Sequence, residues 1–362
     1  MAEKNVVVVG AGVIGLTTAL LLSQNPRYRI TIAAKHMPGD YDIEYASPWA
    51  GANYAPVSLE GTVEAEYDRS TWPELLRLAR KVPEAGIHTQ QNVVYKRIKD
   101  AQSVTSKWFA DLLSSRPWFA DEVPDFRDLG ADELPEGVDC GISYTSVCIN
   151  TPQYLHYLMG RCLRNRVAIH RANFNHLLEA RNVHSSNRSA DLIVNCTGLG
   201  SQKLGGVNDS ALVPARGHVV IVRNETPDKI TFISGTDDGS DETTYIMMRA
   251  AGGGTIIGGC YQEGQTDPTP DPALGQRILQ RAVKLCPDLA GGKGVAGLDV
   301  IRHGVGLRPV RKGGPRIQIE RLGGCLIVHN YGHGGFGYQA SYGCARAAAD
   351  LVAAALSDRA RL

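Results

Sequence analysis

The amino-acid sequence predicts an α/β chain, α+β overall, with one domain built on a parallel sheet and a second on a mixed or antiparallel sheet. Near each end of the chain an apolar strand runs into a glycine-rich turn and a helix, which indicates the parallel sheet. Between these ends the sequence breaks into short alternating strands, which indicates the other sheet. At 362 residues, the chain is long for one core and suits two domains.

The first strand is expected at residues 6–9, a run of four valines with no polar member, as in a parallel strand buried on both faces. Three glycines spaced G-x-G-x-x-G follow and lead into a helix. The first permits a tight turn, the second lets the backbone approach a pyrophosphate, and the third lets helix and strand pack closely. We interpret the turn as a Rossmann-like nucleotide-binding loop made of Gly10, Ala11, Gly12, Val13, Ile14 and Gly15.

The second strand, residues 29–34, leaves the nucleotide undecided. An acidic residue that binds the ribose is expected near its end, but Lys35 and His36 stand there. Either another group holds the ribose, or the cofactor is not simple NAD.

Composition excludes several partner classes. A net charge of +1 provides no field to attract nucleic acid or an anionic membrane. No apolar run approaches the ~20 residues that span a bilayer. The eight cysteines lack C-x-x-C and C-x-x-H spacings, so we expect no metal site and no disulfide framework, but mostly buried, reduced thiols.

The middle of the chain is interpreted as an insertion over residues 54–141, with a helix near 74–82 and long irregular segments. Thr151 as cap and Pro152 at the first helical position predict the helix that returns to the nucleotide domain. Further strands are expected at residues 166–170, from 191, and at 218–222, 244–248 and 255–258.

The second glycine-rich loop follows an apolar strand that begins near Ile327, and an alanine-rich helix at 345–356 comes after it. Two histidines and two tyrosines are interleaved with its glycines. A strand, glycine loop and helix can present N–H groups to another part of a large cofactor. The glycines are Gly332, Gly334, Gly335 and Gly337.

Five segments resemble, in order, the motifs of the D-amino-acid oxidase family: residues 10–15, 46–53, 195–198, 304–309 and 329–335. The resemblance implies an FAD-binding domain with a parallel sheet, made of residues 1–55, 145–200 and 300–362. It implies a substrate-binding domain with a mixed sheet, made of 56–144 and 201–299. The first loop would then hold the pyrophosphate of FAD, and the family tolerates the missing ribose acid.

The resemblance also implies cofactor contacts beyond the first loop. Gly51, Ala52 and Asn53 would line the flavin ring, where backbone N–H groups near N5 and O4 stabilise the reduced anion. The other implied FAD-binding residues are Lys35, His36, Ser47, Ala172, Cys196, Thr197, Gly198, Arg308, Gly332, Gly334, Gly335, Gly337, Tyr338 and Gln339.

The implied reaction is oxidative deamination of a D-amino acid, an oxidoreductase reaction on a CH–NH2 group with oxygen as acceptor. Hydride passes from Cα to flavin N5, dioxygen becomes hydrogen peroxide, and the imino acid is hydrolysed to a 2-oxo acid and ammonia. Arg308 matches the family's substrate arginine, whose fork suits a carboxylate. Tyr245 would also bind the carboxylate, Tyr261 would line the pocket, and the Gly335 carbonyl would accept from the amine.

The expected substrates are neutral and apolar D-amino acids. A second cation would be needed to pair the side chain of D-aspartate, and Arg249 lies four residues beyond Tyr245. Tyr54 is expected to extend an apolar wall of the pocket. An acidic lid is expected to repel a dicarboxylate; its carboxylates belong to Asp237, Asp238, Asp241 and Glu242.

Other interpretations stay open. One is a D-aspartate oxidase, or an oxidase of glycine or N-methylated amino acids, in the same superfamily. Others are a nicotinamide-dependent dehydrogenase and a nucleotide-binding sensor without turnover. The segment between Ile319 and Cys325 is short, whereas some fungal relatives carry a long dimerisation insertion, and a homodimer stays one of the open interpretations.

The chain ends Ala360-Arg361-Leu362, which fits the small-basic-leucine pattern of a peroxisomal address read by an import receptor. A hydrogen peroxide product makes a catalase-containing compartment chemically sensible. Without a functional signal, the expected location is the cytoplasm.

Removing Ala360 to Leu362 should therefore disperse a fluorescently tagged chain from peroxisomes into the cytosol, as fluorescence imaging would show. Unchanged punctate fluorescence after the deletion would contradict the assignment. A tail of equal length ending in Ala-Glu-Leu is the matched control and should also be cytosolic.

Overall fold

The computed structural model describes residues 3–109, 112–114, 116–225 and 229–357. The chain forms two compact units. Unit 1 comprises Met1–Pro48, Pro152–Pro214 and Leu307–Leu362, and unit 2 comprises Trp49–Thr151 and Ala215–Gly306. The C-terminal tripeptide lies outside the described residues.

The unit boundaries differ from those predicted. Residues 49–55 and 145–151 belong to unit 2 rather than to the nucleotide domain, because the first of these segments pairs with the second. Ala52 and Ile149 exchange backbone hydrogen bonds of 3.2 and 2.8 Å, and Tyr54 N donates to Val147 O at 3.2 Å. The other boundaries fall inside two long strands, near residues 214 and 307.

Unit 1 is built on a six-stranded sheet in the order β14-β15-β7-β1-β2-β6. All neighbouring pairs are parallel except β14 with β15. The valines predicted for the first strand are buried, as expected of a central parallel strand. The strands are β1 (Lys4–Val9), β2 (Tyr28–Ala34), β6 (Ala168–Arg171), β7 (Leu192–Asn195), β14 (Arg316–Leu322) and β15 (Cys325–Tyr331).

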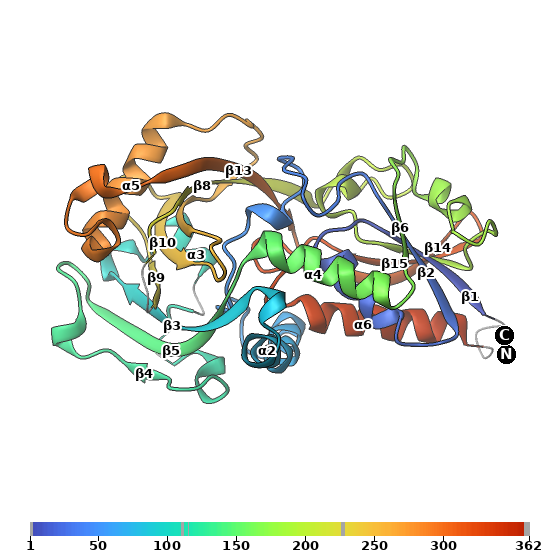
Figure 1. Ribbon diagram of the computed structural model, residues 1–362, viewed down its shortest axis with the longest axis horizontal. Coiled ribbons are helices and arrows are strands. Elements are labelled where there is room, and N and C mark those ends of the chain that lie inside the picture. Colours follow the sequence, from blue (N-terminus) through green and yellow to red (C-terminus); the bar gives the residue numbers. More distant parts are fainter. Residues whose placement is uncertain (1–2, 110–111, 115, 226–228, 358–362) are drawn as a thin grey trace. The chain divides into compact units, whose positions relative to one another are not determined.

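Three helices accompany this sheet: α1 (Val13–Leu22), α4 (Thr151–Arg164) and α6 (Ser341–Leu356) (Figure 1). The Cys162 thiol of α4 donates to Leu16 O of α1 at 3.5 Å. Thr151 is the first residue of α4 rather than its cap. Its hydroxyl instead donates to Ala50 O at 3.3 Å.

Unit 2 contains a nine-stranded mixed sheet in the order β12-β8-β11-β10-β9-β3-β5-β4, with β13 paired to β8 (Figure 1). The pair β3 and β9 is parallel, and β3 runs antiparallel to β5 over its whole length. The strands are β3 (Ile87–Lys96), β4 (Arg127–Asp128), β5 (Cys140–Ile149), β8 (Leu212–Val222), β9 (Lys229–Ile233), β10 (Glu242–Met248), β11 (Thr255–Cys260), β12 (Gln262–Glu263) and β13 (Val300–Arg311).

The helices of unit 2 are α2 (Val63–Lys81), α3 (Val104–Trp108) and α5 (Pro272–Leu285). Helix α5 packs Leu274 and Ile278 against Val220 and Ile246 of the sheet in a fully buried cluster. Each such side chain stabilises the fold by about 1.5–3 kcal/mol relative to an exposed one. The helix predicted near residues 74–82 is present as part of the longer α2. The rest of residues 54–141 was predicted to contain long irregular segments, but it also supplies β3, α3 and β4, so that part of the prediction was wrong.

The parallel sheet and the mixed sheet confirm the predicted fold class. All eight cysteines are free thiols, and seven of them are buried. Among the described residues, no helix combines the length and hydropathy needed to cross a membrane.

Candidate active site

The G-x-G-x-x-G turn of unit 1 joins β1 to α1 with no room for side chains at its glycines. Gly10 has φ of +114°, and a Cβ built on it would lie 2.3 Å from Cys196 O. A Cβ on Gly15 would lie 2.0 Å from Gly10 O. The first and third glycines are therefore required by close backbone packing.

Three side chains from later segments brace this turn. The hydroxyl of Tyr45 donates to Ala11 O at 2.7 Å, and Val13 N donates to Ser47 Oγ at 3.0 Å. The hydroxyl of Tyr338 donates to Ser47 O at 2.9 Å. Ser47, a predicted cofactor residue, thus caps the start of α1, where N–H groups and the helix dipole favour an anion.

The turn after β7 lies beside the same loop, because β7 and β1 are neighbours in the sheet. Cys196 N donates to Val9 O at 2.8 Å. The side-chain Oδ1 of Asn195 accepts from Thr197 N and from Thr197 Oγ1, at 3.1 and 2.9 Å. Gly198 has φ of +57°. Burial raises the pKa of the Cys196 thiol to about 12, so this thiol stays neutral.

The second glycine loop also meets the first. A Cβ on Gly337 would lie 3.9 Å from Val13 Cγ1. His333 is buried, and its Nε2 has no hydrogen-bond partner among the described residues. Burial lowers the pKa of His333 to about 3, so the ring is neutral.

The strand that carries Arg308 is held against this loop. Gly334 N donates to Pro309 O at 2.9 Å, and Val310 forms an antiparallel bridge with His333. On the other side, a Cβ on Gly198 would lie 4.0 Å from Pro309. Unit 1 therefore brings Arg308-Pro309 between two segments predicted to bind the cofactor.

The arginines near Arg308 have structural partners. Arg311 pairs with Asp209 at 2.8 Å, and Arg316 pairs with Glu320 at 2.7 Å. Arg302 lies over the Trp49 ring, 5.5 Å from its centroid. Arg308 itself is half-buried on β13.

Two carboxylates lie near the end of β2, although sequence reasoning found no acidic residue there: those of Asp40 and Glu44. Lys35 pairs with Glu44 at 3.5 Å, and the His36 ring stacks on Tyr45. Asp40 accepts two hydrogen bonds from Arg171, which hold its carboxyl pKa at about 2.

Ala172, which follows Arg171, lies beside the end of β2 because its N–H donates to Ala34 O at 3.1 Å. Like Lys35, His36 and the 196–198 turn, it follows the carboxyl end of a parallel strand, the usual ligand-binding edge of such sheets.

In unit 2, Tyr245 lies on β10 opposite Gly258 of β11. The Tyr245 ring fills the space that a side chain at position 258 would need, since a Cβ on Gly258 would lie 2.0 Å from Tyr245 Cζ. Tyr261 follows β11, is buried, and donates its N–H to Asp241 O at 2.7 Å.

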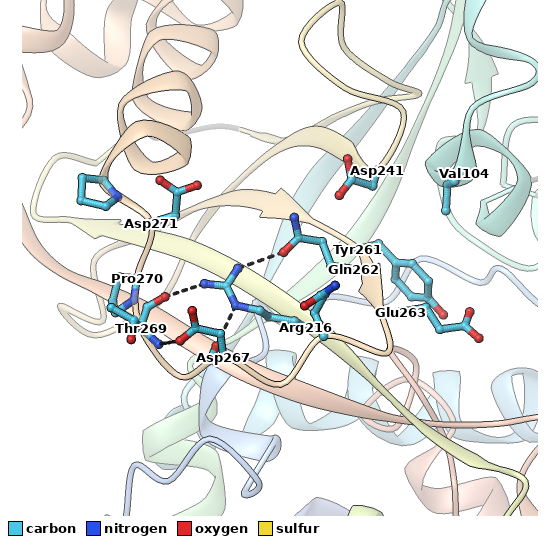
Figure 2. Close-up of a pocket in the computed structure, with 12 residues that line it drawn as sticks. Val104, Arg216, Asp241, Tyr261, Gln262, Glu263, Asp267, Thr269, Pro270 and Asp271 are labelled. Atoms are coloured by element: carbon cyan, nitrogen blue, oxygen red, sulfur yellow. Dashed lines mark hydrogen bonds between the residues drawn. The ribbon is translucent and has the colours of Figure 1, made fainter.

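Tyr261 lines a cavity of about 780 Å³ in unit 2 (Figure 2). At its centre Arg216 is buried and donates to Gln262 Oε1 and to two backbone carbonyls, those of Asp267 and Thr269. Its guanidinium therefore holds the segment 262–269, which lines the cavity. Sequence reasoning missed Arg216, which carried no motif.

The segment 50–53, predicted to line the flavin ring, is fixed within unit 2. Asn53 bridges Cys148 of β5, and Arg249 donates to the carbonyls of Ala50 and Gly51 at 2.7 Å each. A Cβ on Gly51 would lie 2.3 Å from Met247 Sδ.

The predicted acidic lid is largely neutralised, which corrects the expectation that it repels a dicarboxylate. Asp237 pairs with Arg97 at 3.1 Å and with Lys99 at 2.7 Å. Arg281 pairs with Asp238 at 2.7 Å and with Glu242 at 2.5 Å, and Glu242 also pairs with Arg277. Asp241 lines the cavity.

The prediction for Tyr54 was wrong as well. Its ring is fully buried and stacks on Trp72 of α2 with centroids 4.7 Å apart. Tyr54 is part of the core of unit 2.

The arrangement in unit 1 fits FAD. The tight glycine turn and the capped start of α1 suit a pyrophosphate, and the unpartnered Nε2 of buried His333 marks the second glycine loop as a place for a further polar contact. Residues from the first loop, the 196–198 turn and the 332–339 loop would hold the cofactor.

Comparison with known proteins agrees with this geometry. A family model described as FAD-dependent oxidoreductase matches residues 5–351. The chain belongs to this family, and it is therefore an FAD-dependent enzyme.

Three similar proteins are named as oxidases of D-amino acids. A D-amino-acid oxidase of Fusarium vanettenii is 51% identical over 97% of both chains, and one of Schizosaccharomyces pombe is 36% identical over 94% of both. A D-aspartate oxidase of Talaromyces thermophilus is 31% identical over 96% of this chain and 95% of that one.

A solved structure shares the fold. The glycine oxidase of Geobacillus kaustophilus matches with a TM-score of 0.74 and 20% identity, over 99% of this chain and 96% of that chain.

The predicted residues thus fall into two sets. Unit 1 gathers the first loop, Ser47, the 196–198 turn, Arg308 and the second glycine loop at one sheet edge. Unit 2 holds segment 51–53, Tyr245 and Tyr261. Sequence reasoning missed Tyr45, which braces the first loop. The only signal for Tyr45 in the sequence was its place beside the 46–53 motif.

Replacing Gly10 by alanine should lower both FAD retention and stability. The strained φ alone costs about 1–3 kcal/mol, and the new Cβ would clash with Cys196 O. Visible absorbance of the purified protein and urea unfolding measure the two effects. Gly160→Ala in α4, where no atom lies within 4 Å of the built Cβ, should raise stability by about 0.5–1 kcal/mol. Equal FAD retention in both variants would contradict the role of the turn.

Proposed function

We propose that this enzyme oxidises neutral and apolar D-amino acids to 2-oxo acids, with release of ammonia and reduction of dioxygen to hydrogen peroxide. The observation that carries the proposal is the placement of Arg308-Pro309 against Gly198 and Gly334, at the cofactor-binding edge of unit 1. The high identity to the Fusarium D-amino-acid oxidase over nearly the whole chain supports it.

Each residue has a definite task in this proposal. The Arg308 guanidinium binds the substrate carboxylate through two parallel N–H···O bonds, and the Tyr245 hydroxyl donates a third. The Gly335 carbonyl accepts from the substrate amine and thereby orients Cα. Tyr261 excludes water from the pocket. Bound FAD supplies the acceptor for the hydride of Cα and passes the electrons to dioxygen.

No side chain is assigned as a base, because an amine that binds in its neutral form leaves no proton to remove before hydride transfer. The neutral state of buried His333 is consistent with this assignment, since its low pKa makes it a poor proton acceptor at neutral pH.

A D-aspartate oxidase is the second candidate, favoured by the neutralised lid and by the Talaromyces relative. It requires a second cation for the side-chain carboxylate. The described bonds of Arg249 go to the protein itself, which favours neutral substrates.

We also propose a peroxisomal location, supported by the Ala-Arg-Leu ending and by the peroxide product. An import receptor that reads this ending would be the protein partner.

Anaerobic D-alanine should bleach the visible bands of the purified, FAD-loaded protein, and air should restore them. A peroxide assay should then give a higher kcat/KM for D-alanine, D-methionine or D-phenylalanine than for D-aspartate, and no activity on L-alanine. Flavin bands that persist with every D-amino acid would refute an oxidase of this class. A D-aspartate value above all neutral ones would select the second candidate.

Arg308→Ala should raise KM for D-alanine by about two to four orders of magnitude, because losing one partner of a buried ion pair costs about 3–5 kcal/mol. FAD should remain bound, as absorbance would show. Arg308→Lys should retain part of the affinity, since it keeps the charge but loses the fork. Arg321→Ala, at an exposed arginine of β14, is the control. A KM within threefold of the parent in Arg308→Ala would contradict the assignment.

A further inference from the structure

Arg249 is a buried cation with an unusual set of partners. Only 2% of the residue is exposed. Its Nε donates to Gly51 O at 2.7 Å, and its Nη2 donates to Ala50 O at 2.7 Å and to Thr151 Oγ1 at 2.9 Å. The three N–H groups on these two nitrogens are thus directed to a single short stretch of backbone and the hydroxyl beside it.

The two carbonyls belong to consecutive residues, so one planar guanidinium fixes two peptide groups at once. C=O and N–H point to opposite sides of a trans peptide. Holding Ala50 O therefore sets the direction of Gly51 N–H. A lysine at this position would offer a point charge without this fork.

The face of β10 that continues to Arg249 also packs against segment 50–53. Residues 245, 247 and 249 follow one another at every second position of β10 and its end, so they share a face of the sheet. Met247 occupies the space where Gly51 would carry a Cβ. Backbone pairing of Ala52 with Ile149 holds the other end of the segment.

We propose that Arg249 is a positioning residue that sets the backbone of segment 50–53 for its contacts with the flavin ring, and that it is not a substrate ligand. This inference rests on the proposed function, in which Gly51, Ala52 and Asn53 line that ring. Donors aimed at the ring stabilise its reduced anion only if they are held in place.

Arg249→Lys is the decisive variant, with Arg249→Gln as the uncharged companion. Both should bind FAD but show an altered visible band shape and a more negative reduction potential of the bound flavin. The rate of anaerobic reduction by D-alanine should fall about tenfold to a hundredfold, as expected for a small displacement of a reacting group. KM for D-alanine should change less than threefold.

The matched control is Arg223→Lys. Arg223 belongs to the same unit, and its ion pair with Asp299 is exposed. This variant should match the parent in spectrum, potential and rate.

Three outcomes would overturn the inference. A parent-like potential and reduction rate in Arg249→Lys would show that the fork is not needed. A loss confined to thermal stability would show a purely structural role. A selective rise in KM for D-aspartate would make Arg249 a substrate ligand.

The control experiments separate this inference from the proposed function. If Arg249→Gln fails to fold, as circular dichroism would reveal, Arg249→Lys alone still decides. If the parent protein binds FAD but oxidises no D-amino acid, the proposed function fails, while dithionite titration of parent and variant still measures the potential shift.

Discussion

The close approach of β1 and β7 through Gly10 is the constraint on which unit 1 depends. Because no Cβ fits between Gly10 and the Cys196 carbonyl, the turn after β1 and the turn after β7 meet at one edge of the sheet. Gly15 then lets α1 start directly above Gly10. The second glycine loop meets the first through Gly337 and Val13.

Side chains from distant segments stabilise this edge. Tyr45, Ser47 and Tyr338 each bond to a backbone group of the turn or to each other, so the loop is braced without any charged residue. Asp209 serves a similar purpose nearby, because it accepts from both Arg311 and Tyr331 and so links the end of β13 to the end of β15.

The sequence predicted this region well because local patterns determine it. Valine runs and glycine spacing encode β1, α1, β15 and α6, which need little information from elsewhere. The strands β3 and β5 were missed because their mixture of polar and apolar residues, as in Gln90-Gln91-Asn92, gains its burial only from pairing across the sheet. Helix α5 was not predicted, although its start carries a recognisable signal, Asp271 before Pro272. A signal of the same kind, Thr151 before Pro152, was used to predict α4.

The interpretations of pocket chemistry were less accurate because they depended on tertiary partners. Tyr54 was assigned to a pocket wall, yet a stacking partner in α2 places it in the core. The four lid carboxylates were counted as net negative charge, yet three of them pair with cations that lie far away in sequence, at residues 97, 99, 277 and 281. Spacing within a motif carries no information about such pairs.

The pairing of the lid has a consequence for how ligands approach the enzyme. Exposed carboxylates that are matched by cations produce little long-range field, so electrostatic steering by this loop is weak for zwitterions and dianions alike. Discrimination between substrates then arises after encounter, from contacts and desolvation inside the pocket, and association should respond little to ionic strength. An enzyme of this design recognises its substrate by fit rather than by attraction from a distance.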